Sequence, residues 1–355
     1  MNVSVTNACN RRCAYCFQKD WYLSKKANST TDESVREMPL EEFRRLCEWA
    51  APQRVVKLMG GEPLLHSDVP GLIKAAGDAG KHVTFISNIS VEAERFDPVI
   101  ELCRAEDSNV KSFLINTDYP ASQEAVFKEN LTKLCTTSLS LSFSTTLLPG
   151  TKEIEKARAR IAELAGIYKS IRKTMVGFRV RLAPFCPNPT DSTGFRVYDF
   201  TEDVMNFINS LYPTGIPEYG FDCPVNMCEL RPDFVDACRQ MGTDVRVERC
   251  SPEQGMPFDI LVDHSVIWCS SANFLRLDDW RRFPTFHEAH RALSDQYYAW
   301  WRGHREASAC RSCDKHNPGY CAGFCIAKTA HFEGSPHIIP IRPGSVRAEA
   351  ASHAL

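Results

Sequence analysis

The chain has 355 residues, and 43% of them are apolar, enough to fill the core of one large domain and a smaller one. Its 42 basic and 44 acidic residues are well mixed and leave a net charge of -2, so no broad basic face for nucleic acid is implied. The first ten residues lack the features of a signal peptide, and no apolar run reaches the roughly 20 residues that span a bilayer. We therefore expect a soluble cytoplasmic protein without a nucleic-acid or membrane partner.

Short apolar runs alternate with helical patterns over about the first 185 residues, which is typical of repeated βα units around a parallel sheet. Residues 40–50 and 153–171 each place apolar side chains on one helical face. Six such units are fewer than the eight of a closed barrel, so we predict an α/β fold with a partial (β/α)6 TIM-like barrel. The predicted strands span residues 2–5, 54–59, 82–87, 110–116, 138–144 and 175–182.

The second half of the chain has a different character. A stretch rich in proline and polar residues at 183–194 precedes one more predicted helix at 201–211. From about residue 212 the periodicity weakens, and cysteine, proline and glycine become frequent. We therefore predict a barrel over residues 1–211 and a smaller, irregular domain over 212–355, organised by metal rather than by a large apolar core. A family resemblance described below implies that this metal is iron-sulfur.

Sixteen cysteines are many for a chain in a reducing compartment, where clustered thiols are metal ligands or redox groups more often than disulfides. Cys47, Cys103 and Cys135 stand alone within apolar helical patterns, and we expect them to be small buried hydrophobic residues.

Three cysteines, Cys9, Cys13 and Cys16, lie within eight residues directly after the first predicted strand. A structural zinc site normally has four protein ligands, whereas a 4Fe-4S cluster held by three leaves one iron open for chemistry. On spacing alone, a cluster and a zinc site completed by a distant residue both remain open.

The stretch CNRRCAYCF resembles the Cys-x3-Cys-x2-Cys signature of the radical SAM superfamily. The resemblance implies that the three cysteines hold a 4Fe-4S cluster, that S-adenosylmethionine (SAM) chelates its open iron, and that Phe17 lies against the adenine. A second motif of the family, Gly-Gly-Glu-Pro, ends the second predicted strand. Glycine lets the backbone approach a ligand closely, and a carboxylate can hold the amino group of SAM. Its members here are Gly60, Gly61, Glu62 and Pro63.

Weaker matches to the family's SAM contacts follow at the ends of later strands. At each position an ordinary polar residue at a strand end is the alternative. These matches are Ser87 and Asn88 on the third strand, Asn116 and Asp118 on the fourth, Ser142 or Ser144 on the fifth, and Arg179 or Arg181 on the sixth.

A second group of cysteines resembles the SPASM extension of radical SAM enzymes. It departs from that pattern in one spacing, in a histidine, His264, where glycine is usual, and in the absence of a final cysteine. The resemblance implies one or two auxiliary 4Fe-4S clusters, with Cys223 and Cys228 replacing missing ligands, and a zinc site for the last four cysteines is the alternative. The proposed ligands are Cys223, Cys228, Cys250, Cys269, Cys310, Cys313, Cys321 and Cys325.

The resemblance also implies an oxidoreductase or maturase that cleaves SAM to a 5′-deoxyadenosyl radical, which removes a hydrogen atom from the substrate. Flavodoxin or ferredoxin is the expected electron donor. A ribosomally made peptide is the leading substrate hypothesis. Since the first residues already belong to a strand, such a peptide would need a separate leader-recognition protein or direct docking.

Other functions stay open as hypotheses. The second hypothesis is oxidation of a small molecule such as a sugar or aminocyclitol. Sulfatase maturation is disfavoured, because those enzymes have an aspartate where Ser270 stands here. A non-catalytic zinc-binding adaptor would have little use for the intact Gly-Gly-Glu-Pro motif.

Two further sets of residues near the auxiliary region draw attention. Asp222, Asp263 and His264 are weak candidates for a proton acceptor. Tyr297, Trp300 and Trp301 are expected either to form a peptide-docking surface or to belong to a helix packed on the barrel.

Overall fold

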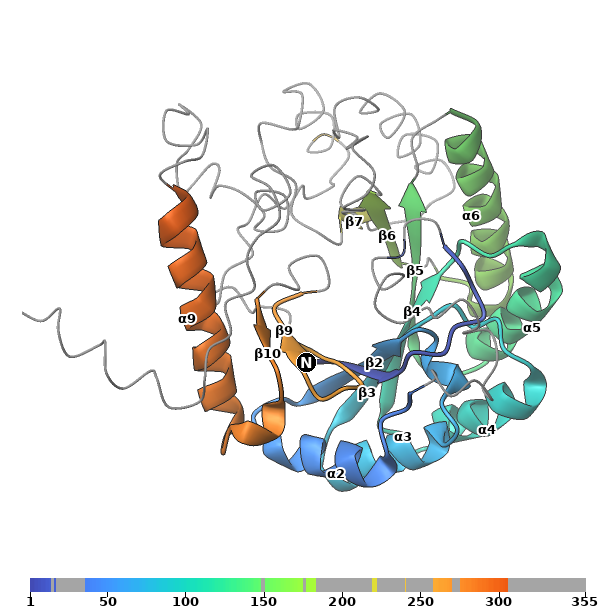
Figure 1. Ribbon diagram of the computed structural model, residues 1–355. Coiled ribbons are helices and arrows are strands. Elements are labelled where there is room, and N and C mark those ends of the chain that lie inside the picture. The colour runs from blue at the N-terminus through green and yellow to red at the C-terminus, as the bar shows by residue number, and fades with distance from the viewer. Residues whose placement is uncertain are drawn as a thin grey trace, which may run out of the picture.

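The computed structural model describes residues 1–13, 16, 36–147, 151–174, 177–182, 219–221, 240, 258–269 and 275–305. These parts form an α/β fold in which one curved sheet carries helices on its outer side (Figure 1). The described helices include none with the length and apolar character of a membrane span.

The sheet has ten strands among the described residues, in the order β10-β9-β8-β1-β2-β3-β4-β5-β6-β7. From β8 through β1 to β7 every neighbouring pair is parallel, and all six predicted strands are confirmed in sequence order. The partial barrel is therefore the observed architecture. Its strands are β1 (Asn2–Thr6), β2 (Val55–Gly60), β3 (His82–Ser87), β4 (Val110–Asn116), β5 (Ser140–Leu147), β6 (Gly177–Leu182), β7 (Tyr219–Phe221), β8 (Asp259–Ile260), β9 (Val266–Ile267) and β10 (Arg276–Leu277).

A helix follows each of the first strands and covers the outer face of the sheet (Figure 1). Asp68 shows how one of them begins, since its carboxylate accepts a 2.8 Å hydrogen bond from the backbone N–H of Gly71 and so caps the first turn. The helices are α2 (Leu40–Trp49), α3 (Val69–Asp78), α4 (Ala93–Arg104), α5 (Glu124–Cys135) and α6 (Thr151–Arg172), with the short turns η1 (Pro63–Leu65) and η2 (Ala121–Gln123).

The sheet buries the face that carries the apolar residues. Leu58 of β2 pairs with Phe85 of β3, which pairs with Phe113 of β4, and all three are fully buried. The rings of Phe85 and Phe113 stack at 4.6 Å. The alternate residues, Lys57 and Thr84, are exposed or half-buried, so the opposite, inner face of these strands is more polar.

Residues 258–269 and 275–305 join the same sheet and core. β8 pairs with β1 through Asn2 and Asp259, and α9 (Phe286–Arg305) follows the short turn η9 (Trp280–Arg282). Tyr297 is fully buried and stacks on Trp268 at 4.4 Å, while Trp300 is 5% exposed.

The hypothesis of a docking surface is therefore wrong for Tyr297 and Trp300, and the alternative of a packed helix is confirmed. The aromatic face of α9 is buried because it completes the apolar core beside β9 and β10. The helix predicted at 201–211 and the domain boundary at residue 212 lie outside the described residues.

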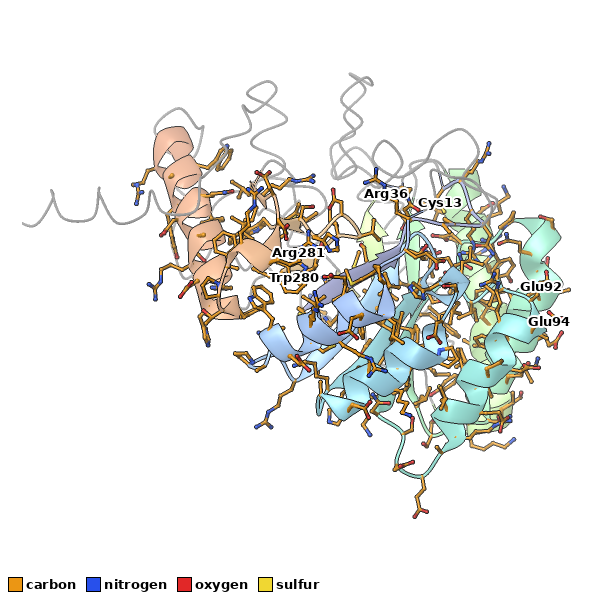
Figure 2. All side chains as sticks on the ribbon, turned by 60° about the horizontal axis from the view of Figure 1, so that its bottom comes forward. Cys13, Arg36, Glu92, Glu94, Trp280 and Arg281 are labelled. Carbon is orange, nitrogen blue, oxygen red and sulfur yellow. The ribbon has the colours of Figure 1, made fainter. Side chains whose placement is uncertain are left out.

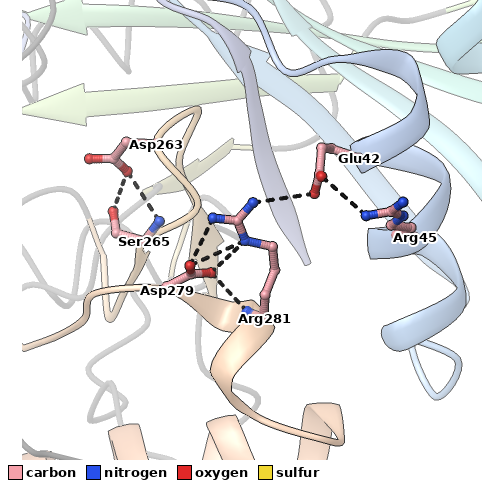
Figure 3. Close-up of polar contacts among 6 residues, drawn as sticks. All are labelled: Glu42, Arg45, Asp263, Ser265, Asp279 and Arg281. Atoms are coloured by element: carbon pink, nitrogen blue, oxygen red, sulfur yellow. Dashed lines mark hydrogen bonds and ion pairs between the residues drawn. The ribbon is translucent and has the colours of Figure 1, made fainter.

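Helix α9 and the turn before it are attached to α2 by a cluster of rings. The indole N–H of Trp49 donates to the carbonyl of Phe283 at 2.8 Å, and the Trp49 ring lies 5.1 Å from Trp280. Beside the rings, Arg281 bonds to Asp279 at 2.8 Å and lies 3.8 Å from Glu42 of α2 (Figure 3). The rings stabilise this contact more than the exposed ion pairs do.

Trp280→Ala is expected to lower the free energy of unfolding by about 3–5 kcal/mol, because it removes a large ring that is only 4% exposed. Figure 2 shows Trp280 next to Arg281 between α9 and the barrel. Arg281→Ala is the matched control, and its loss should stay below about 1 kcal/mol. Urea unfolding followed by far-UV circular dichroism measures both, and equal losses would contradict the assignment of the stabilisation to the rings.

The three isolated cysteines are buried as predicted. Cys47 and Cys103 are 1% exposed and Cys135 is 2% exposed. Burial raises the pKa of the Cys47 and Cys103 thiols to about 12 and that of Cys135 to about 11.

These three thiols should resist iodoacetamide at neutral pH in the folded protein and react fully in denaturant. They are inaccessible, and their raised pKa values leave almost no reactive thiolate. Peptide mass mapping after alkylation measures the outcome. Fast labelling of Cys47, Cys103 or Cys135 in the native protein would contradict this packing.

Candidate functional site

The carboxyl ends of β1 to β4 bring the sequence motifs together. Strand β1 ends at Thr6, and the cysteine loop begins directly after it. Figure 2 shows Cys13 beyond this end of β1. In a parallel sheet the loops that follow neighbouring strands share one edge, which is where such folds place their ligands.

Cys9, Cys13 and Cys16 are each partly exposed. The backbone N–H of Arg11 donates to the Cys9 sulfur at 3.4 Å, and the N–H of Cys16 donates to the carbonyl of Cys13 at 3.1 Å. Burial raises the pKa of Cys9 to about 12, against the smaller effect of the Arg11 hydrogen bond. A metal ligand there must lose this proton on binding.

The donor set is compatible with an iron-sulfur cluster. Within the described ranges, no group of three or more His, Cys, Asp or Glu side chains is placed to hold one metal ion. A 4Fe-4S cluster binds each thiolate through a different iron, so its ligands need not converge on one point. Three thiols on one short loop meet that requirement.

Gly60 and Gly61 lie against the backbone of the cysteine loop. A Cβ on Gly60 would lie 2.2 Å from the carbonyl oxygen of Thr6, and one on Gly61 would lie 2.1 Å from that of Ala8. Gly60 also has a φ of +139°, which strongly favours glycine. The N–H groups of Gly61 and Glu62 donate to Thr6 and Ala8 at 2.9 and 2.7 Å. Only glycine lets the motif lie this close to the loop.

Glu62 connects the motif to the end of β3. It is 1% exposed, and its carboxylate accepts hydrogen bonds from the Ser87 hydroxyl at 2.6 Å, the Asn88 N–H at 2.7 Å and the Leu64 N–H at 3.1 Å. Burial raises the pKa of Glu62, while these hydrogen bonds and the nearby charge of Arg11 oppose the rise. The structure thus brings Glu62, Ser87 and Asn88 together, and a contact with SAM stays a prediction for each.

The end of β4 is tied to β5 by Asp118. Its carboxylate accepts from the hydroxyl of Thr145 at 2.7 Å and from the N–H of Thr146 at 2.9 Å, and its own N–H donates to Asn116 at 2.9 Å. The carbonyl of Ser144 accepts from the backbone N–H of Thr117 at 2.9 Å. These residues share one edge of the sheet, as predicted.

Strands β5 and β6 follow β4 in the sheet. Ser144 pairs with Asn116, the last residue of β4, whereas Ser142 pairs with Leu114, two residues before that end. The register pairs Ser142 with Gly177, Ser144 with Arg179, and Thr146 with Arg181. Ser142, Ser144, Arg179 and Arg181 therefore occupy neighbouring positions on two adjacent strands.

Two residues of the site were missed by the sequence analysis. Asn10 contacts Asn88 at 2.9 Å and donates to the carbonyl of Ser90. Arg11 is 6% exposed and reaches the ends of β3 and β4, whereas Arg12 is exposed. Nothing in the pattern distinguishes Arg11 from Arg12, because a tight loop has no periodicity that would identify its buried side.

The weak candidates for a proton acceptor near β8 have local roles. Asp263 accepts hydrogen bonds from the N–H and hydroxyl of Ser265 (Figure 3) and pairs with Arg276 at 2.8 Å. Burial would raise the pKa of Asp263, but these partners outweigh it and lower the pKa, which makes it a poor base. His264 has a φ of +70°, and its N–H donates to the carbonyl of Leu261 in a turn.

Of the predicted auxiliary ligands, Cys269 is described, and it lies partly exposed just after β9. Phe17 lies outside the described residues. The same holds for the other predicted residues of the auxiliary region, which are Asp222, Cys223, Cys228, Cys250, Cys310, Cys313, Cys321 and Cys325.

A partial (β/α)6 barrel with three thiols in the loop after its first strand defines a class of iron-sulfur barrel. Comparison with known proteins identifies the family. Residues 3–118 match the model of the radical SAM superfamily. Residues 3–118 therefore form a radical SAM domain.

Curated relatives match part of the chain. The 7,8-dihydro-6-hydroxymethylpterin dimethyltransferase of Methanocaldococcus jannaschii is 36% identical over 92 residues, which cover 24% of this chain and 16% of that protein. The GTP 3′,8-cyclase of Nitrobacter winogradskyi is 34% identical over 117 residues, which cover 31% of this chain and 32% of that protein. The chain thus spans about a third or less of the length of these relatives.

A solved structure extends the likeness in fold. SuiB of Streptococcus suis, bound to the precursor peptide SuiA, superposes with a TM-score of 0.51 at 11% identity. The match covers 76% of this chain and 58% of SuiB. It shows a shared fold.

Proposed function

We propose that this protein is a radical SAM oxidoreductase that holds a 4Fe-4S cluster on Cys9, Cys13 and Cys16 and binds SAM beside it. The observation that carries the proposal is the three-thiol loop lying against Gly60 and Gly61 at the carboxyl ends of the strands. When bound, cluster and SAM supply the one-electron chemistry that removes a hydrogen atom from a substrate.

The protein's own residues hold and orient these groups. Gly60 and Gly61 fix the loop against β2, and Glu62 ties the motif to Ser87 and Asn88. We propose that SAM lies along this edge. The groups that would contact it are Phe17, Ser87, Asn88, Asn116, Asp118, Ser142, Ser144, Arg179 and Arg181.

We propose a ribosomally made peptide as the substrate, modified oxidatively, for instance by a cross-link. The support is a fold shared with SuiB, which is bound to a precursor peptide, and the cysteines after residue 212, which we assign to one or two auxiliary 4Fe-4S clusters. A separate leader-recognition protein, a flavodoxin or ferredoxin as electron donor, and a cytoplasmic location complete the proposal.

The second candidate is a small-molecule substrate, such as a sugar or aminocyclitol. What favours this class is that the curated relatives are named for reactions of a pterin and of GTP. Sulfatase maturation ranks below both.

Anaerobic reconstitution followed by iron, sulfide and zinc analysis tests the cofactors. About 4 irons per chain support the triplet alone, about 12 support two auxiliary clusters as well, and zinc without iron overturns the proposal. SAM cleavage under reducing conditions then tests the activity. Mass spectrometry of candidate peptides and aminocyclitols, incubated with the reconstituted enzyme, discriminates the two substrate classes.

A further inference from the structure

A buried arginine stands between two of the cluster ligands. Arg11 lies between Cys9 and Cys13 and is 6% exposed, while its neighbour Arg12 is exposed. Burying a guanidinium is costly unless acceptors fill its N–H groups, since it does not lose its charge in proteins. The partners of Arg11 therefore show what this burial achieves.

The guanidinium of Arg11 reaches the segments that follow two different strands. After β3, Nη2 donates to the carbonyl of Asn88 at 3.0 Å and to the hydroxyl of Ser90 at 2.7 Å. After β4, Nη1 donates to the carbonyl of Asp118 at 3.1 Å, with two oxygens of Asn116 at 3.4 Å. The planar fork makes these contacts at once, which a lysine cannot do.

A third element holds the same side chain. Nε of Arg11 donates to Gln123 in η2 at 3.1 Å, and the guanidinium lies 5.9 Å from the ring of Phe127 in α5. Gln123 also donates to the carbonyl of Asn10 at 2.9 Å, so it holds the loop at two consecutive residues, Asn10 and Arg11.

The backbone of Arg11 contacts a ligand atom. Its N–H donates to the sulfur of Cys9 at 3.4 Å. Hydrogen bonds to ligand sulfurs stabilise the added negative charge of a reduced cluster, and outer partners of ligands orient them. Because this N–H belongs to Arg11 itself, contacts that hold the Arg11 side chain also fix the position of its N–H.

We propose that Arg11 is the positioning residue of the cysteine loop, joining it to the ends of β3 and β4 and so holding its own N–H on the sulfur of Cys9. The effect of Arg11 on the cluster rests on the proposed function. The geometric claim, that Arg11 joins the loop to the ends of β3 and β4, concerns the chain alone. Arg11 acts through Cys9 and is not itself a catalytic residue.

The test uses Arg11→Lys, which keeps the charge but loses the fork, and Arg11→Met, which loses both. Arg12→Met is the matched control, since it removes the same charge from an exposed position one residue away. Redox titration followed by electron paramagnetic resonance measures the cluster potential. Both Arg11 variants should shift the reduction equilibrium about tenfold, which is about 59 mV more negative for one electron. Binding of SAM should weaken about 10- to 100-fold.

The Arg12→Met control distinguishes an effect of the location of Arg11 from an effect of its charge. Arg12→Met should keep the parent potential and SAM affinity, and an equal shift there would overturn the inference. Parent-like values in Arg11→Lys would overturn it as well. If Arg11→Met does not fold, Ser90→Ala carries the test, because it removes one acceptor of the guanidinium and should move the potential in the same direction by less.

A measurement on the cluster-free chain separates this inference from the proposed function. Arg11→Lys should raise the alkylation rate of Cys9 by about tenfold over Arg12→Lys, because the loop opens more often. If Cys9 is alkylated at different rates in Arg11→Lys and Arg12→Lys but the parent protein binds no iron, the proposed function is wrong and the positioning role stands. Equal rates would sink the positioning role, whatever the iron content.

Discussion

Cys13→Ala is expected to abolish SAM cleavage while leaving the fold intact. Cys13 is partly exposed and lies on a loop outside the apolar core, so its removal should cost little stability. With two thiolates in place of three, iron loading should fall sharply. Cleavage should drop by more than about 100-fold, since loss of even an outer partner of a ligand costs 10- to 100-fold.

Cys103→Ala is the matched control for this prediction, because it removes a thiol that is buried in α4 and far from the loop in sequence. It should keep the parent iron content and cleavage rate. Iron analysis and chromatographic detection of 5′-deoxyadenosine measure both variants. Parent-like cleavage in Cys13→Ala would disprove the assignment of the cluster to the triplet.

Gly61→Ala is expected to separate the Gly-Gly-Glu-Pro motif from the cysteine loop. The new Cβ would lie 2.1 Å from the carbonyl oxygen of Ala8, and that oxygen also accepts the N–H of Glu62. Relief of such a contact moves backbone and costs about 1–3 kcal/mol or more. Iron loading and SAM binding should both fall by more than about tenfold, since the displaced segment holds the loop.

Gly166→Ala supplies the comparison. Gly166 lies in α6, and among the described residues no atom outside its own helix lies within 4 Å of the position that a Cβ would take. That change should raise stability by about 0.5–1 kcal/mol and leave iron loading unchanged. Thermal unfolding and iron analysis measure both variants, and a Gly61→Ala protein with parent iron content would show that the close approach is dispensable.

The barrel was predictable because each βα unit has a local period. Buried apolar residues stand at alternate positions of a strand, as Val56 and Leu58 do in β2 and Val83 and Phe85 in β3, which is the mark of a sheet with one buried face. β8 to β10 have two residues each, too few to show a period. β8 forms by pairing with β1 across the chain, and β9 and β10 then add to it as antiparallel strands. The buried aromatic face of α9 had two possible meanings until its neighbours were known.

The candidate site was predictable in its members and less so in their contacts. Cys9, Gly61 and Glu62 meet at one edge because parallel strands end together. The expectation that glycine admits a ligand is only part of the explanation, since Gly61 lies against the chain's own backbone at Ala8. The role of Arg11 depends on acceptors at distant strand ends, which no local pattern reveals.

Strand β1, which leads into the cysteine loop, lies between β2 and β8. Asn2 of β1 donates to Asp259 of β8 at 2.6 Å across a separation of 257 residues. During synthesis β1 therefore waits for its second neighbour until β8 has emerged, and such distant pairing is slow to form. Iron insertion into the triplet should accordingly be a late event in the maturation of this protein, after β8 has paired with β1.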